Sequence, residues 1–202
     1  MSQNRSSAVM QQRSEPHDSL DDFPTPPWAT RALCERLGPI TCVQSVREPA
    51  ANRGHMVKPL AEYFYKVEAS DIHDYGVGFP QQDYLFGPPP DRTDWTITNP
   101  PFRLAEQFIR RGLECSDHVA VIVRSAFLEG VGRHRDMFSI HRPRLVLQFT
   151  ERVVMHKGKL SAKGSTATAY CWILWSNGHT GPTEFDWIPP CRKRLERAED
   201  YE

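Results

Sequence analysis

Residues 95–123, WTITNPPFRLAEQFIRRGLECSDHVAVIV, contain two β-rich runs with a helix-like run between them. Trp95–Thr98 predicts a strand, and Leu104–Leu113 has the helical spacing of apolar residues. His118–Val123 is a continuous run in which every residue after His118 is apolar. Such a run is typical of a strand buried on both faces of a parallel sheet. The stretch therefore predicts a βαβ unit within an α/β fold.

The same alternation extends on both sides of this unit. Further strands are predicted at Val43–Arg47, Lys66–Ser70, Arg144–Phe149 and Ala169–Trp175, and further helices from Thr25 to about Leu37, at Val57–Tyr65 and at Ala126–Phe138. Thr25 is expected to cap the first helix, which Gly38-Pro39 ends. No helical pattern separates the last two strands, so they are expected to be antiparallel, whereas the rest of the sheet is parallel and covered on both faces.

Length and composition fit one α/β domain with short appendages. The chain has 202 residues, and its five Trp and ten Phe can build a core. We expect a flexible tail at residues 1–21, the domain at residues 22–180 and a C-terminal tail at residues 181–202. The 25 basic and 25 acidic residues balance, so overall charge does not indicate a partner.

The cysteines and histidines predict no metal site. Five cysteines without a CxxC pair argue against a disulfide framework and against zinc, and the eight histidines lack metal-ligand spacing. No apolar run is long enough to span a membrane, and the N-terminus lacks a signal-peptide core. We expect a cytoplasmic protein with no membrane partner. The sequence does not indicate an oligomeric state.

One stretch, from Arg124 to Lys163, is strongly basic, with nine basic and three acidic residues. Such a stretch is typical of a site for a polyanion, although a solvated surface without a partner is the alternative. The candidate nucleic-acid contacts within it are Arg124, Arg133, Arg135, Lys157, Lys159 and Lys163.

The strongest local motif is Asn99-Pro100-Pro101-Phe102, directly after a predicted strand. The prolines restrict the backbone and make a rigid shelf, which at the carboxyl edge of a parallel sheet faces the ligand crevice. A planar amino group there can donate to the Asn99 side-chain oxygen and the Pro100 carbonyl, while Phe102 stacks on its ring. Catalysis would then consist of orientation and electrostatic preorganisation. An ordinary proline-rich strand exit is the alternative.

Three weaker signals precede this motif, each beside a predicted strand end. Glu48–Met56 contains a glycine-bearing turn of the kind that lets a cofactor approach the backbone. Asp71 follows about twenty residues later, where a carboxylate can bind ribose hydroxyls. Asp83 is placed to accept a hydrogen bond from an adenine amino group. These three signals and the NPPF motif occur in succession, each beside a predicted strand end. Their order supports a ligand site more strongly than any one of them alone.

Together these residues resemble the amino-methyltransferase branch of class I S-adenosylmethionine-dependent methyltransferases. Glu48–Met56 resembles the first cofactor motif of the family, Asp71 and Asp83 its ribose and adenine positions, and Asn99–Phe102 its catalytic (D/N/S)PP(Y/F/W) motif. Segments Asp22–Thr30, Arg124–Gly130 and Gly164–Tyr170 are similar to small phage and prophage adenine methyltransferases. The resemblance covers about Asp22 to Trp175 and implies a place in the cytoplasm of a bacterium or a phage-infected host.

The resemblance implies a Rossmann-like fold with a seven-stranded, mostly parallel sheet whose last strand is antiparallel. It assigns catalysis to Asn99, Pro100, Pro101 and Phe102. It assigns S-adenosylmethionine binding to Thr25, Pro26, Glu48, Pro49, Ala50, Asn52, Gly54, Asp71, Ile72, Asp83 and Tyr84. The implied activity is methyl transfer to N6 of a flipped-out adenine in DNA, with the loop of residues 156–168 bordering the target. We expect no large separate recognition domain and therefore a short or relaxed sequence preference.

Two alternatives remain open. Similar motifs occur in enzymes that methylate guanine N2 of ribosomal RNA or protein glutamine, so RNA (through adenine N6 or guanine N2) or protein is a possible acceptor. In addition, Asn52 stands where the family usually has Gly. Asn tolerates a left-handed backbone, but its side chain can crowd the cofactor. A non-catalytic protein that binds S-adenosylmethionine or nucleic acid is therefore the second alternative.

Overall fold

The computed structural model describes residues 21–201, so the tail expected at residues 1–21 lies outside the described residues except for Asp21. The described chain forms a seven-stranded sheet in the order β2-β1-β3-β4-β6-β5-β7. Its strands are β1 (Ser45–Glu48), β2 (Lys66–Ala69), β3 (Thr93–Thr98), β4 (Ser116–Arg124), β5 (Leu145–Phe149), β6 (Tyr170–Ser176) and β7 (Glu184–Ile188). Strand β6 is antiparallel to both of its neighbours, and every other neighbouring pair is parallel.

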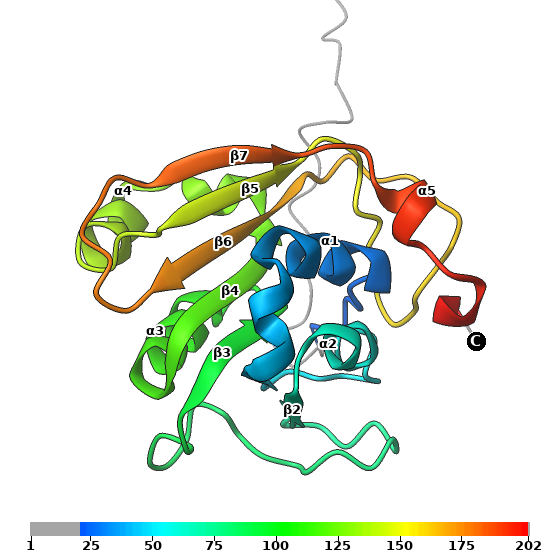
Figure 1. Ribbon diagram of the computed structural model, residues 1–202, viewed down its shortest axis with the longest axis horizontal. Helices are drawn as coiled ribbons and strands as arrows, with labels where there is room; N and C mark the ends of the chain where they lie inside the picture. The colour runs from blue at the N-terminus through cyan, green and yellow to red at the C-terminus, as the bar shows by residue number, and fades with distance from the viewer. Residues whose placement is uncertain (1–20, 202) are drawn as a thin grey trace, which may run out of the picture.

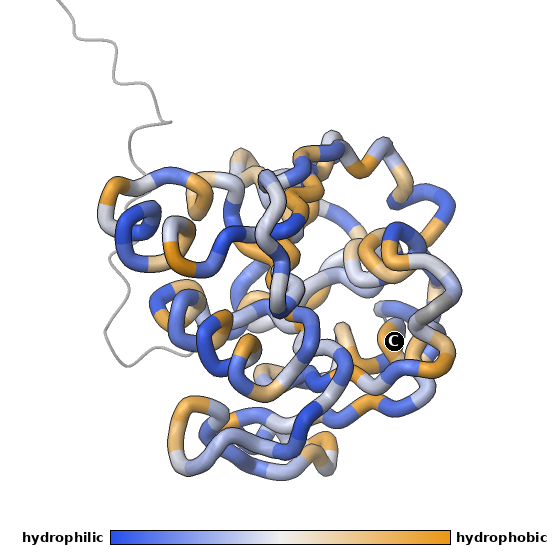
Figure 2. Tube along the Cα trace, turned by 60° about the vertical axis from the view of Figure 1, so that its left-hand side comes forward, coloured by the Kyte–Doolittle hydropathy of each residue, from blue (hydrophilic) through white to orange (hydrophobic). Residues whose placement is uncertain are grey.

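Helices cover both faces of the sheet (Figure 1). The helices are α1 (Pro27–Leu37), α2 (Val57–Tyr63), α3 (Ala105–Cys115), α4 (Val131–Arg133) and α5 (Arg192–Leu195). Helices α1 and α2 lie on one face and α3 on the other. Hydrophilic and hydrophobic positions alternate along the helices in Figure 2, as amphipathic helices require. The predicted α/β fold with a mostly parallel seven-stranded sheet is confirmed.

Two tryptophans of β6 show how the two faces are filled. Trp172 and Trp175 are three residues apart, so the strand alternation directs them to opposite faces of the sheet. The indole of Trp172 donates to the Ala29 carbonyl at 3.1 Å, and that of Trp175 donates to the His141 carbonyl at 2.9 Å. Both side chains are buried, and their N–H groups are satisfied. They are core residues of the two layers.

The start of α1 differs from the prediction, because Pro26 and not Thr25 is the N-cap. Pro26 and Pro27 have no backbone N–H to be capped, and the N–H of Ala29 already donates to the Pro26 carbonyl at 2.9 Å. The Thr25 hydroxyl is left buried and without a hydrogen-bond partner in the described structure. The predicted end of the helix at Gly38 is confirmed.

The helix predicted at Ala126–Phe138 is wrong as a continuous element. The segment consists of a 3-10 turn at Ser125–Leu128, the single turn α4, and a π-helical turn at His134–Phe138. Gly130 has a φ of 116°, a conformation outside the helical region, and it separates the first two pieces.

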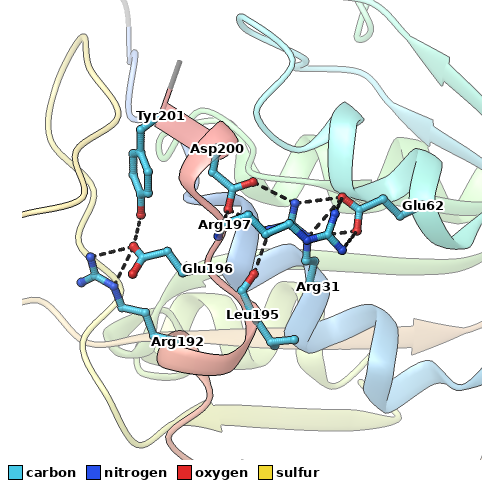
Figure 3. A network of polar contacts seen from close by, with 8 residues as sticks. All are labelled: Arg31, Glu62, Arg192, Leu195, Glu196, Arg197, Asp200 and Tyr201. Carbon is cyan, nitrogen blue, oxygen red and sulfur yellow. Dashed lines mark hydrogen bonds and ion pairs between the residues drawn. The ribbon is translucent and has the colours of Figure 1, made fainter.

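The segment expected as a C-terminal tail contributes to the fold. Residues 184–188 form β7, which pairs in parallel with β5 at the sheet edge. The antiparallel strand β6 is therefore the sixth of seven in chain order. Beyond β7, Asp200 accepts hydrogen bonds from the buried guanidinium of Arg31 at 2.7 and 2.8 Å, and Arg31 also pairs with Glu62 of α2 (Figure 3). Long-range pairing and ion pairs thus hold residues that look like a tail in the sequence.

Candidate active site

A cleft opens at the carboxyl edge of β1, β2 and β3, where the sequence predicts a ligand site. It is lined by segments that follow all three strands and by the segment before α1. The lining residues are Asp21, Phe23, Pro24, Thr25, Pro49, Ala50, Ala51, Asn52, His55, Met56, Asp71, Ile72, His73, Tyr75, Gln82, Asp83, Tyr84, Leu85, Asn99, Pro101, Leu104 and Phe108. The cleft encloses about 220 Å³. The NPPF segment (Asn99–Phe102) and the cofactor turn (Glu48–Met56) therefore face one open space.

Asn99 presents an unpaired acceptor at the wall of this cleft. Its side-chain Nδ2 donates to the Phe23 carbonyl at 2.8 Å, which fixes the plane of the amide. Its Oδ1 is buried and accepts no hydrogen bond from the described residues. An unsatisfied buried acceptor is costly, and in a native site it points to a donor that arrives with a ligand. Asn99 is thus oriented to accept an N–H.

Phe102 lies between two other side chains beside the cleft. The Phe23 ring is 5.4 Å from it, and the Arg124 guanidinium carbon lies 4.4 Å from its ring centroid. The Phe102 backbone N–H donates to Asp21 Oδ2 at 2.5 Å. A planar ring that stacked on Phe102 would need Arg124 or Phe23 to move. Pro100 is buried within the segment, and Pro101 lines the cleft.

Asn52 adopts the left-handed conformation expected from its place in the turn. Its φ is 51°, and it is the one non-glycine residue with positive φ among residues 21–201. Its backbone N–H donates to Asp71 Oδ2 at 2.8 Å, and its side chain donates to Asp22 Oδ1 at 2.6 Å. Gly54, with a φ of 84°, supports the turn from behind, where a Cβ would lie 3.1 Å from the Phe79 ring.

Glu48 lies beneath the turn and is fully buried. Its Oε1 accepts from the Ala50 N–H at 2.9 Å, and its Oε2 accepts no well-formed hydrogen bond from the described residues. Burial raises the pKa of Glu48 to about 8. The Thr98 hydroxyl and the Ala50 N–H oppose this rise, whereas the negative charge of Asp71 adds to it. Glu48 therefore shapes the floor of the cleft and does not line it.

The two aspartates predicted to contact the cofactor both line the cleft. Asp71 is buried, and its carboxylate accepts from the backbone N–H groups of Asn52 and His73 at 2.8 and 2.9 Å. A carboxylate has about four lone-pair sites, so these two bonds leave acceptor capacity. Asp83 is exposed, and its Oδ1 accepts from the Leu85 N–H at 2.9 Å.

The other predicted cofactor residues fall into two groups. Thr25, Pro49, Ala50, Ile72 and Tyr84 line the cleft, and the buried Thr25 hydroxyl has no hydrogen-bond partner among the described residues. Pro26 lies outside the lining, at the N-cap of α1.

The basic residues predicted to bind nucleic acid have different surroundings. Arg124 stacks on Phe102 and so borders the site. Arg133 is bound to Glu106 at 3.0 Å and to the carbonyls of Phe127 and Glu129, so its donors hold α4 in place. Arg135 pairs with its neighbour Asp136 on the surface.

The remaining candidates, Lys157, Lys159 and Lys163, are exposed on the loop of residues 156–168. The Gly158 N–H donates to the Asp22 carbonyl at 2.8 Å, which brings this loop beside the segment that lines the cleft. The structure therefore joins Arg124 and the lysine loop to the site and leaves Arg133 and Arg135 engaged elsewhere.

Several cleft residues were not predicted from the sequence. Phe23 supplies the carbonyl that orients Asn99. The Arg53 guanidinium lies 4.7 Å from the ring centroid of Tyr75, and burial raises the pKa of Tyr75 to about 12. Burial lowers the pKa of His55, and the charges of Arg53 and Lys58 lower it further. Tertiary contacts bring Phe23 and Tyr75 to the cleft, whereas Arg53 and His55 belong to the predicted turn Glu48–Met56.

The described residues contain no cluster of His, Cys, Asp or Glu able to hold a metal ion. Within the same part of the chain, no helix is both long and apolar enough to cross a membrane.

Comparison with solved structures identifies the fold. A Listeria monocytogenes protein assigned to the class I S-adenosylmethionine-dependent methyltransferases superposes with a TM-score of 0.63 at 12% identity, over 84% of this chain and 67% of that one. The chain has the class I methyltransferase fold. No protein-family model matches the sequence, and no curated protein matches it either.

Two further structures share this methyltransferase fold. The methyltransferase subunit of a type I restriction-modification system from Streptococcus thermophilus has a TM-score of 0.58 at 12% identity, over 89% of this chain and 50% of that subunit. The present chain thus spans about half the length of that subunit. Magnesium protoporphyrin IX methyltransferase from Synechocystis, solved with bound S-adenosylmethionine, has a TM-score of 0.51 at 13% identity, over 74% of this chain and 78% of that one.

Proposed function

We propose that this chain transfers a methyl group from S-adenosylmethionine to an exocyclic amino group, N6 of adenine in DNA. The observation that carries the proposal is the buried Oδ1 of Asn99, to which no residue between 21 and 201 donates a hydrogen bond although the amide is fixed by Phe23. An amino group donates through N–H and satisfies such an acceptor. The methyltransferase fold and the shared cleft support the same interpretation of the site.

The residues of the cleft fit S-adenosylmethionine. The carboxylates of Asp71 and Asp83 suit ribose hydroxyls and an adenine amino group, and the unpartnered Thr25 hydroxyl is a further donor in the cleft. The left-handed turn at Asn52 and Gly54 exposes backbone to the ligand. When bound, S-adenosylmethionine supplies an electrophilic methyl group.

The chain's own contribution is to orient the acceptor. Asn99 Oδ1 and the Pro100 carbonyl accept the two N–H groups of the amine, which draws its lone pair out of conjugation and directs it into the cleft. The nitrogen then releases one proton to solvent. Orientation and preorganised dipoles supply most of the effect, and no strong base is needed.

A nucleic-acid acceptor is supported by the surroundings of the site. A flipped base can stack on Phe102 once the Arg124 side chain moves from that ring, and the freed guanidinium can then bind phosphate. Lys157, Lys159 and Lys163 are proposed as further phosphate contacts. The similarity in fold to restriction-modification methyltransferase subunits supports a nucleic-acid acceptor.

The proposal is tested by methyl transfer in vitro. The purified chain is incubated with S-adenosylmethionine and with unmethylated DNA, RNA or ribosomes, and the nucleosides are analysed by mass spectrometry. We expect N6-methyladenine in DNA. Asn99→Ala should lower the rate by about 100-fold, comparable to the loss of one preorganised polar group, without abolishing cofactor binding in calorimetry.

Gln107→Ala is the matched control, because Gln107 is exposed on α3 and should leave the rate unchanged. Equal rates for Asn99→Ala and wild type would remove Asn99 from the mechanism. Methylation of RNA or protein alone would reject DNA as the acceptor. An absence of any cofactor heat would favour a non-catalytic protein.

A further inference from the structure

Asp22 lies where the cofactor turn meets the segment before α1. Its Oδ1 accepts from Asn52 Nδ2 at 2.6 Å, and its Oδ2 accepts from Arg53 Nη1 at 3.0 Å. The Asp22 side chain is 10% exposed, whereas that of Arg53 is 40% exposed, so the Asp22 carboxylate is largely shielded from water but its partner Arg53 is not. One buried carboxylate therefore holds two consecutive side chains of the turn.

The bond from Asp22 determines where the Asn52 amide lies. Asn52 lines the cleft in a left-handed conformation. In this conformation the side chain of any residue except glycine is crowded by the backbone. Its Nδ2 is held by Asp22, and its Oδ1 accepts from the Arg53 N–H at 2.7 Å. Both ends of the amide are thus engaged, and the side chain has one preferred orientation. Without Asp22 the Nδ2 group loses this partner, and the amide is free to rotate in the cleft.

Arg53 makes a second contact with Asp22 and also contacts Tyr75. Its guanidinium pairs with Asp22 and stacks on the ring of Tyr75, which also lines the cleft. The Tyr75 ring in turn lies 4.7 Å from that of His73. Because the Arg53 side chain is 40% exposed, its pair with Asp22 contributes little, and the main effect of Asp22 is on Asn52.

The residues beside Asp22 contact the acceptor side of the cleft. The Phe23 carbonyl accepts from Asn99 Nδ2 at 2.8 Å, and Asp21 Oδ2 accepts from the Phe102 N–H at 2.5 Å. The Asp22 carbonyl itself accepts from the Gly158 N–H of the lysine loop. Three consecutive residues thus connect the cofactor turn, the NPPF segment and that loop.

We propose that Asp22 is a positioning residue for the cofactor turn. Its carboxylate holds the Asn52 side chain out of the space that a ligand of the turn occupies, which allows a non-glycine residue at this left-handed position. The inference rests on the proposed cofactor site. Asp22 acts through Asn52 and touches no reacting atom. Its loss should therefore lower the ligand affinity, and it should do so only if residue 52 carries a side chain.

A double-mutant cycle on S-adenosylmethionine affinity tests this dependence. Asp22→Ala should weaken binding about tenfold in the Asn52 background, the size expected for one lost charged hydrogen bond. In the Asn52→Gly background the same change should cost less than about twofold. Asp22→Asn keeps an acceptor for Asn52 Nδ2 and should stay within about threefold of wild type. An equal loss in both backgrounds would overturn the proposal.

A second measurement needs no ligand. The side-chain amide resonance of Asn52, assigned by its absence in Asn52→Gly, should shift in Asp22→Ala and stay near its wild-type position in Asp22→Asn. An unshifted resonance in Asp22→Ala would disprove the bond on which the inference depends. If no variant binds S-adenosylmethionine while the resonance shifts as expected, the proposed function fails and the positioning of Asn52 stands.

Asp186→Ala is the matched control, because it removes an exposed aspartate–arginine pair, with Arg36, outside the cleft. It should change neither the affinity nor the Asn52 resonance. A loss of affinity in Asp186→Ala equal to that in Asp22→Ala would mean that general destabilisation explains both.

Discussion

At the scale of single residues, the site is defined by polar atoms whose partners are incomplete. The Oδ1 of Asn99 and the hydroxyl of Thr25 belong to residues that line the cleft, and both atoms are buried without a hydrogen-bond partner among the described residues, as is Glu48 Oε2 beneath the cleft. A folded protein satisfies most of its buried polar atoms, so a group of exceptions around one cleft indicates a site that a ligand completes. In Asn52, by contrast, both polar atoms of the side chain have a partner within the protein. Its Nδ2 donates to Asp22, and its Oδ1 accepts from the Arg53 N–H.

Glu48 gives a prediction at this scale. Its pKa is raised by burial to about 8, above the value of about 4.3 in an unfolded chain. The folded state therefore retains the Glu48 proton at pH values at which the unfolded state has released it. The contribution of Glu48 to the unfolding free energy is fully present below about pH 4.3 and is lost as the pH rises through 8. Glu48→Gln cannot titrate. Between pH 5 and 8.5, wild type should lose at least about 1 kcal/mol of unfolding free energy relative to the variant.

The measurement is urea denaturation of both proteins across this pH range. Stability curves for wild type and Glu48→Gln that run parallel from pH 5 to 8.5 would contradict the raised pKa of Glu48.

At the scale of elements, α3 illustrates how closely a helix can approach the sheet. Helix α3 follows the NPPF segment and packs against β3 and β4. A Cβ on Gly112 would lie 2.8 Å from Val119 Cγ2 of β4 and 3.5 Å from Thr96 Cβ of β3. Gly112 lies within the helix, where glycine is otherwise unfavourable, so close packing explains its presence.

Gly112→Ala should therefore destabilise the protein, although alanine is the better helix former. The added methyl group must displace α3 from β4, which should lower the unfolding free energy by about 1–3 kcal/mol. Gly132→Ala is the control, since a Cβ there meets nothing within 4 Å. Thermal denaturation distinguishes the two. A Gly112→Ala variant as stable as Gly132→Ala would show that α3 is loosely packed.

At the scale of the whole molecule, the C-terminal segment is tied to the helical layer by buried charges. Arg31 of α1 binds Asp200 and Glu62, and Arg197 also pairs with Glu62 (Figure 3). The side chains of Arg31 and Asp200 are 3% and 4% exposed. Breaking such a pair leaves an uncompensated buried charge, which costs more than the loss of a surface pair.

Asp200→Asn should lower the unfolding free energy at pH 7 by about 3 kcal/mol. Burial opposes ionisation of Asp200, but hydrogen bonds from Arg31 and from the Arg197 N–H outweigh it and lower the pKa. The contribution is therefore present above the unfolded value of about 3.9 and is lost as pH falls through the lower folded pKa. The difference between variant and wild type should shrink below about pH 4.

Asp186→Asn, which breaks the exposed pair with Arg36, should cost less than about 1 kcal/mol. Urea titrations of the three proteins at pH 7 and pH 3 make the comparison. A cost for Asp200→Asn that is equal at both pH values would contradict the role assigned to its ionised form.

The sequence by itself determined the alternation of strands and helices, the parallel sheet and the edge at which the motifs meet. Apolar periodicity and proline and glycine positions are local properties, and parallel strands necessarily end at the same edge. For this reason the sequence alone could predict that the NPPF segment, the Asn52 turn and Asp71 share one cleft.

Only the tertiary structure decided the features that depend on residues far apart in the chain. Strand β7 forms because it pairs with β5. The guanidinium of Arg133 is hydrogen-bonded because Glu106 and two backbone carbonyls lie close to it. The orientation of Asn99 by Phe23 and of Asn52 by Asp22 likewise requires the segment before α1 to cross the cleft. Such contacts have no periodicity along the sequence, since they arise when packing brings distant segments together.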